Sequence, residues 1–179
     1  LFWLIDDYLL WSGSAISDSY LEYQKATNQM KLLQSGKGTG LKRLFNKNTG
    51  LDDLYVFKES SISVLPSSDP NNRLYSISQK VGSSQHDTIT VYNDMIVFLS
   101  NQKTICIVKD GRVIDISSRS IPKSMTKLVD GAVARAGIVF DNYYALCMRD
   151  DTAKLYNTKI WVCDLRKVRE VEQGCANSV

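Results

Sequence analysis

The feature that most constrains the fold of this chain is a local pattern that recurs along it: a short apolar run, a polar link of two residues and a second apolar run. Clear copies are LFWLI-DD-YLLWS, LYVFK-ES-SISVL, TITVY-ND-MIVFLS and GIVF-DN-YYALCM. Short runs rich in β-branched and aromatic residues predict strands, whereas amphipathic helices place apolar residues three and four positions apart. A polar link of two residues suits a tight reversal between antiparallel strands. The chain is therefore expected to be all-β, built of antiparallel β-meanders.

The pattern predicts thirteen strands and six hairpin links. The strands are expected at residues 1–5, 8–12, 30–34, 54–58, 61–65, 74–78, 88–92, 95–100, 104–109, 113–116, 137–140, 143–148 and 160–164. The links are Asp6-Asp7, Glu59-Ser60, Asn93-Asp94, Asn101-Gln102, Asp110-Gly111 and Asp141-Asn142. Asp110-Gly111 is the strongest turn signal, because a type I′ turn needs positive φ, which Gly and Asp tolerate.

Two segments interrupt the meanders. Residues 12–28 are polar with scattered Tyr and Leu, and they predict a long surface excursion with one helical turn near residues 19–25. Residues 121–129, with Pro122 near a helix-start position, predict a short helix.

The number of strands favours a β-propeller of about four blades, since a four-stranded blade takes about 40–45 residues. We expect a propeller-like domain over residues 1–165 and a polar C-terminal extension over residues 166–179. The first residue is not Met and lies inside an apolar run, so the chain is expected to be a fragment of a longer one. A β-sandwich would give the same local signals and stays open as an alternative.

Composition narrows the classes of partner. Apolar residues make up 44% of the chain and charged residues 23%, as in ordinary folded domains. The apolar runs are too short for the roughly 20-residue helix that spans a bilayer. A net charge of +3 from scattered Lys and Arg does not predict a nucleic-acid surface.

The cysteine pattern does not predict a metal site. The chain has no CxxC motif and a single histidine, whereas structural zinc sites use paired CxxC or Cys₂His₂ ligands. The four cysteines are Cys106, Cys147, Cys163 and Cys175. Three lie in strand-like runs, which predicts reduced thiols in the core and an intracellular origin. A disulfide between Cys147 and Cys163, on neighbouring predicted strands, is the alternative.

Three kinds of motif suggest catalysis or ligand binding, and each has a plainer interpretation. Ser35-Gly36-Lys37-Gly38-Thr39-Gly40 is glycine-rich like a phosphate cradle but lacks GKS or GKT and a following helix, so we expect a flexible loop. His86 is expected in a turn before a strand and not in a catalytic triad. The carboxylate pairs are expected to be solvated turn residues, although a sugar hydrolase using one pair is the weakest functional alternative. These pairs are Asp6/Asp7, Asp52/Asp53 and Asp150/Asp151.

Aromatic residues are the remaining candidates for a binding surface. Trp3, Trp11 and Trp161 lie in predicted strands and are expected between sheets. Exposed rings near loops can contact a partner protein or stack on a glycan. The candidate contact residues of this kind are Tyr20, Tyr23, Tyr143 and Tyr156.

Longer stretches of the chain carry a resemblance to a known family. They are LFWLIDDYLLWSGSAISDSY, LDDLYVFKESSISVL, KVGSSQHDTITVYNDMIVFLSNQKTICIVKDGRVIDISSRSI, and GIVFDNYYALCM followed by KIWVCDL. Over residues 1–165 this order of strands and turns resembles tailed-bacteriophage virion proteins with a β-propeller in the tail or its adaptor region. The chain departs from that family at Asn101-Gln102-Lys103, where a Gly commonly stands.

The resemblance implies a structural role and no enzymatic one. It implies a tail component of the virion, assembled in the host cytoplasm, whose propeller docks neighbouring virion subunits in a homo-oligomeric ring. It implies no catalytic residue and no cofactor. A receptor- or glycan-binding propeller and an intracellular interaction scaffold are the alternative expectations.

Overall fold

The computed structural model describes residues 1–12, 28–34, 36–117, 133–149 and 159–168. Within these residues there are fourteen β-strands and three 3₁₀ turns. The strands are β1 (Phe2–Ile5), β2 (Tyr8–Trp11), β3 (Gln29–Lys31), β4 (Gly38–Asn46), β5 (Leu51–Lys58), β6 (Ile62–Leu65), β7 (Tyr75–Ser78), β8 (Thr90–Tyr92), β9 (Met95–Leu99), β10 (Ile105–Lys109), β11 (Arg112–Asp115), β12 (Val133–Phe140), β13 (Tyr143–Arg149) and β14 (Lys159–Asp164). The 3₁₀ turns are Pro66–Ser68, His86–Thr88 and Leu165–Lys167. The prediction of an all-β chain is confirmed.

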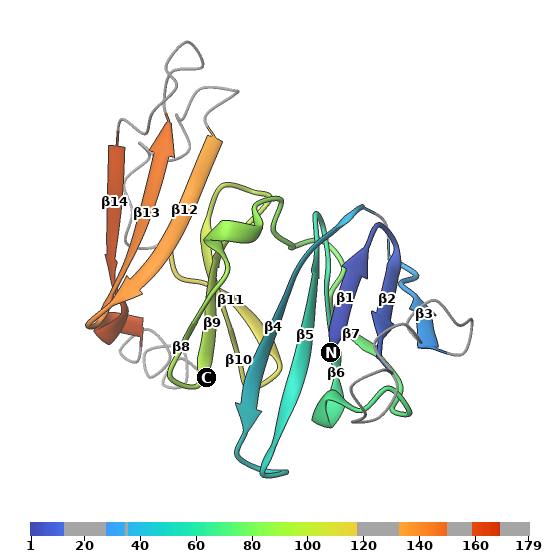
Figure 1. Cartoon of the computed structure of the whole chain (residues 1–179). Helices are drawn as coiled ribbons and strands as arrows, with labels where there is room; N and C mark the ends of the chain where they lie inside the picture. Colours follow the sequence, from blue (N-terminus) through green and yellow to red (C-terminus); the bar gives the residue numbers. More distant parts are fainter. Residues whose placement is uncertain (13–27, 35, 118–132, 150–158, 169–179) are drawn as a thin grey trace, which may run out of the picture. The chain divides into compact units, whose positions relative to one another are not determined.

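The strands form antiparallel sheets within two compact units, residues 1–84 and residues 85–179 (Figure 1). The first unit contains the sheets β1-β2-β3 and β4-β5-β6-β7. The second unit contains the sheets β8-β9-β10-β11 and β12-β13-β14. In every sheet, neighbours in sequence are neighbours in space, which is the meander that short hairpin links favour. The arrangement of these sheets as propeller blades stays a prediction.

All six predicted links connect consecutive antiparallel strands. Asp6, Asn93 and Asp141 have φ of 49°, 51° and 54°, in the left-handed region that Asp and Asn tolerate. Asp110 and Gly111 have φ of 48° and 70°, as a type I′ turn requires. Local turn chemistry therefore determines where the chain reverses.

The link between β9 and β10 forms a tight turn although residues 101–103 contain no glycine. Lys103 takes the left-handed conformation, with φ of 60°. The Ser100 hydroxyl accepts hydrogen bonds from the backbone nitrogens of Gln102 and Thr104, each at 3.2 Å. These bonds stabilise the turn and compensate for the strained residue.

Strand β4 is the main correction to the predicted pattern. A loop was expected over residues 35–40, but β4 begins at Gly38, and Gly38 and Gly40 pair with Lys58 and Phe57 across an irregularity in the ladder. A Cβ at Gly38 would lie 2.7 Å from Leu4 Cδ1, so the glycine allows close approach of β4 to β1. This glycine serves strand packing, and no helix follows it to bind a phosphate. Ser35 lies outside the described residues.

The core of the first unit lies between its two sheets. Leu9 of β2 packs with Leu54 and Val56 of β5, and partly buried Phe2 and Leu4 of β1 join them. These residues alternate along their strands, because only every second side chain of a strand points to one face. Two sheets packed face to face through such alternating residues form the ordinary two-layer core.

The core of the second unit has the same construction. Val97 and Ile107 of the β8–β11 sheet pack in one cluster with Tyr144 and Leu146 of β13. Partly buried Trp161 of β14 packs against this cluster, which confirms its expected place between sheets. Trp3 and Trp11 are half-buried in the β1–β2 hairpin.

Two predicted segments cannot be compared with the structure. The surface excursion over residues 12–28 lies outside the described residues except for its two ends, and the helix over residues 121–129 lies wholly outside them. Among the residues that are described, no helix is long and apolar enough to cross a membrane.

Candidate interaction surface

One face of the β12-β13-β14 sheet exposes several large apolar side chains to solvent. Four large side chains on this face are more than half exposed. They are Ile138 at 58%, Phe140 at 52%, Ile160 at 66% and Val162 at 57%. The opposite face carries Val139, Tyr144 and Trp161 toward the core. An exposed apolar patch is a candidate binding surface.

The register shows how this surface is built. Ile138, Ala145 and Val162 are cross-strand partners, and Cys147 is the partner of Ile160. Partners in a ladder share one face of the sheet. The central strand therefore contributes small side chains, while the two flanking strands contribute large ones. We refer to Ala136, Ile138, Phe140, Ala145, Cys147, Ile160 and Val162 as the β12–β14 outward face; none of them is charged.

A charged corner lies at one end of this face. Arg166 donates to Asp164 from Nε at 2.9 Å and from Nη2 at 2.8 Å, and Nη2 also donates to the Tyr143 hydroxyl at 2.7 Å. The bond to Asp164 is the main reason that the pKa of Arg166 is raised. The guanidinium carbon of Arg166 lies 5.2 Å from the centre of the Tyr143 ring. The centres of the Tyr143 and Phe140 rings lie 6.0 Å apart. At this corner the charges of Asp164 and Arg166 therefore balance each other, beside the rings of Tyr143 and Phe140.

Tyr143 is the one predicted contact residue that the structure places. Its hydroxyl accepts a hydrogen bond from Arg166, and the Arg166 guanidinium lies over its ring. A sugar stacking on that side of the ring would have to displace Arg166. Tyr20, Tyr23 and Tyr156 lie outside the described residues.

Sequence reasoning did not identify the outward face itself, although a signal for it exists. Residues 160–163 read IWVC, so both faces of this strand are apolar. Such a strand is either covered on both sides or exposes an apolar surface. The expectation that Trp161 lies between sheets assumed that both sides of this strand are covered. In the structure the core covers the Trp161 side, while Ile160 and Val162 on the other side are exposed.

The predicted turn at His86 is confirmed, because His86 begins the 3₁₀ turn His86–Thr88 ahead of β8. Thr88 of this turn is buried, and its carbonyl accepts a hydrogen bond from the Tyr144 hydroxyl at 2.8 Å. The turn therefore helps to join β8 to the core of the second unit.

The expectation that the carboxylate pairs are solvated turn residues is wrong for Asp53. Asp52 and Asp53 both lie within β5 and not in a turn; Asp52 is exposed, but Asp53 is only 5% exposed. Its carboxylate accepts hydrogen bonds from Asn46 Nδ2 at 2.8 Å and from the Ser67 nitrogen at 2.7 Å. The bond from the Ser67 nitrogen stabilises the turn Pro66–Ser68, in which Ser67 has φ of 55°. Asp53 is buried because it satisfies this strained turn.

Asp7 is also more than a solvated turn residue. Its carboxylate accepts a hydrogen bond at 2.8 Å from Nζ of Lys58, whose side chain is only 2% exposed. This bond and the charge of Lys58 lower the pKa of Asp7. Nζ also donates to the Gln34 carbonyl. Lys58 therefore ties the β1–β2 link to β5. Asp150 and Asp151 lie outside the described residues.

The cysteines of the described strands are free thiols. Cys147 pairs with Ile160 and Cys163 pairs with Tyr144, so the two cysteines lie on opposite faces of the sheet. The alternative of a disulfide between them is therefore wrong. Burial raises the pKa of Cys106 to about 11 and also raises the pKa of Cys163. Cys175 lies outside the described residues.

Within the described ranges, no three His, Cys, Asp or Glu side chains are grouped so that they could hold a metal ion. Comparison with protein families, with curated proteins and with solved structures finds no match to this chain.

Proposed function

We propose that this chain is a non-enzymatic structural component of a bacteriophage tail, in which its sheets form propeller blades that dock neighbouring virion subunits. The observation that carries the docking role is the β12–β14 outward face, which has four large apolar side chains more than half exposed and its charged groups at one end. Exposing these side chains to water is unfavourable, and covering them with a partner removes that cost.

The construction of the sheets supports the propeller part of the proposal. Each sheet is a meander of three or four strands, and in each unit two such sheets pack face to face. Propellers repeat this element, a four-stranded meander stacked on the next one. The tail assignment rests on the stretches of the sequence that resemble tailed-phage virion proteins, and it brings with it the virion location and assembly in the host cytoplasm.

The chemistry of three hydrogen-bonded charged residues and one buried thiol supports a structural role. Asp53 and Lys58 are buried and each binds backbone groups, while Asp164 is held by Arg166. Burial raises the pKa of Cys106, which keeps its thiol protonated and a poor nucleophile. Groups used in this way hold turns and strands together and offer no nucleophile beside a general base.

Peptide mapping of purified phage particles by mass spectrometry tests this proposal. We expect the tryptic peptides LYSISQK and LVDGAVAR at the abundance of structural proteins. A lysate of infected cells depleted of particles is the control, because a scaffold of the cell interior would be enriched there. Detection of the peptides only in the depleted lysate would contradict the tail assignment.

A further inference from the structure

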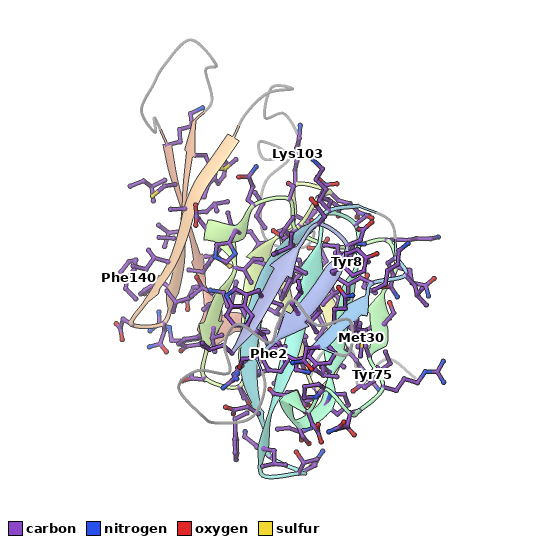
Figure 2. The ribbon with its side chains drawn as sticks, turned by 45° about the vertical axis from the view of Figure 1, so that its right-hand side comes forward. Phe2, Tyr8, Met30, Tyr75, Lys103 and Phe140 are labelled. Carbon is purple, nitrogen blue, oxygen red and sulfur yellow. The ribbon has the colours of Figure 1, made fainter. Side chains whose placement is uncertain are left out.

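We propose that the β1-β2-β3 sheet is the part of the first unit that unfolds first, and that the ion pair between Asp7 and Lys58 is the latch that keeps it folded. Phe2 on β1, Tyr8 on β2 and Met30 on β3 mark this sheet in Figure 2. The sheet and both residues of the latch belong to the first unit. The latch does not depend on the proposed docking role.

The way in which the β1-β2-β3 sheet is attached makes it a separate element. Within the residues that the structure describes, no strand ladder joins it to the β4-β5-β6-β7 sheet. Leu9 of β2 and Leu32, which follows β3, lie in one apolar cluster with Leu54 and Val56 of β5. Strands of four, four and three residues do not stay paired once their packed face is exposed. We therefore expect the sheet to separate and unfold in one step.

The latch is a buried ammonium group on the opposite sheet. Lys58 belongs to β5, and its side chain is only 2% exposed. Its Nζ donates to Asp7 Oδ1 at 2.8 Å and also donates to the carbonyl of Gln34, which follows β3. One charged side chain of the β4-β5-β6-β7 sheet is thus held by both the link that joins β1 to β2 and the segment that follows β3.

The ion pair controls the opening because its two charges are hydrated differently in the closed and open states. In the closed state Lys58 is buried, so it depends on the carboxylate of Asp7. If that carboxylate loses its charge, the closed sheet retains a buried ammonium without its counter-charge, which is strongly unfavourable. In the open state water reaches Lys58 and replaces Asp7. Loss of the Asp7 charge therefore shifts the equilibrium toward the open state.

The backbone of the same link provides reporters of opening. The Asp6 carbonyl accepts a hydrogen bond from the Gly38 nitrogen at 2.9 Å, and the Asp7 carbonyl accepts one from the Leu32 nitrogen at 2.7 Å. These two bonds join the β1–β2 link to the chain that runs from β3 into β4. Opening of the sheet breaks them, so both amides then exchange with solvent.

Acid should release the latch because it neutralises Asp7. The hydrogen bond and charge of Lys58 lower the pKa of Asp7, and the charge of Lys31 on β3 lowers it further. The stabilisation is therefore complete above about pH 4 and is lost as the pH falls through the folded-state pKa. Asp6 and Glu59, next to the pair in sequence, are carboxylates that acid also neutralises, so a variant must separate their effect from that of Asp7.

Residue-resolved amide hydrogen exchange of the full chain tests the latch. The reporters are the amides of Leu32 and Gly38, and the amides of β6 are the internal reference for the β4-β5-β6-β7 sheet. At pH 7, Asp7→Asn should accelerate exchange of the reporters by at least about tenfold and leave the β6 amides unchanged. Asp6→Asn, at the exposed neighbouring carboxylate, is the matched control and should exchange as the wild type does.

Lys58→Met shows whether the two residues act as a pair. In the Lys58→Met background, Asp7→Asn should change reporter exchange by less than about twofold, because no ammonium is left for Asp7 to hold. In acid, the wild-type exchange rates, corrected for the intrinsic effect of pH, should approach those of Asp7→Asn. Thermal unfolding shows which variants fold, and the acid comparison of the wild type with Asp7→Asn decides the question if Lys58→Met does not.

Three outcomes would overturn the inference. The first is reporter exchange in Asp7→Asn at the wild-type rate at pH 7. The second is equal acceleration of the reporters and the β6 amides, which would mean that the first unit unfolds as a whole. The third is an Asp7→Asn effect of the same size with and without Lys58, which would assign the effect to Asp7 alone.

Discussion

Removal of the Tyr144 hydroxyl should destabilise the second unit measurably. This side chain is fully buried, and its hydroxyl donates to the carbonyl of Thr88 at 2.8 Å. Tyr144→Phe keeps the ring but leaves that carbonyl without this donor in a buried site. A buried polar group that loses its partner costs about 1–3 kcal/mol, so we expect the free energy of unfolding to fall by about 2 kcal/mol.

The neighbouring tyrosine provides a matched control. Tyr143 lies on the same strand but on the other face, where its hydroxyl accepts from the exposed Arg166. Tyr143→Phe should therefore change the free energy of unfolding by no more than about 0.5 kcal/mol. Urea titration followed by tryptophan fluorescence can report on the second unit alone, because Trp161 is the one tryptophan left after Trp3→Phe and Trp11→Phe.

The pH dependence gives an independent test of the same contact. Burial raises the pKa of Tyr144 above its ordinary value near 10. The stability that Tyr144 contributes is therefore complete below pH 10 and is lost as the pH rises toward the folded-state pKa. The difference between the wild type and Tyr144→Phe should shrink by up to about 1.4 kcal/mol per pH unit above pH 10. A difference that stays constant at alkaline pH, or equal losses in Tyr144→Phe and Tyr143→Phe, would refute the reasoning.

Three further changes test other parts of the structure. Gly82→Ala should lower the free energy of unfolding by about 3 kcal/mol, because the new Cβ would lie 2.5 Å from the Ser61 nitrogen. Gly50→Ala should lower it by about 1 kcal/mol, because Gly50 has a positive φ but no atom within 4 Å of the new Cβ. Equal losses in urea titrations would contradict this difference in packing. Cys106 should resist alkylation near neutral pH until the protein unfolds, because burial raises its pKa to about 11; peptide mapping that finds Cys106 labelled before Cys147 would count against this. Lys58→Met should remove the stability that the lowered pKa of Asp7 provides above about pH 4. The free energies of unfolding of the wild type and the variant should therefore converge in acid. A difference between them that widens in acid would exclude the predicted role of Lys58.

Local chemistry made most of the fold predictable. The thirteen predicted strands all have counterparts, and the six predicted links all join consecutive strands. Alternation of side chains and the preference of Asp, Asn and Gly for left-handed turns act over a few residues, so the sequence displays them directly. Strand β4 was missed because its first residues include Gly38 and Gly40, and glycine has low strand propensity. Pairing with β5 overrides that propensity.

The candidate site was less predictable for a physical reason. Tyr143 was identified from its position beside a turn, yet the neighbours that define the surface, such as Phe140 and Ile160, read as ordinary strand residues. The burial of Asp53 and Lys58 depends on partners at Ser67 and Gln34, which lie far from them in sequence. The sequence by itself determined where the strands run and where they reverse, because those choices depend on neighbouring residues. Only the tertiary structure decided which face of each sheet is covered and which stays open, because burial depends on contacts between segments that are remote in the chain.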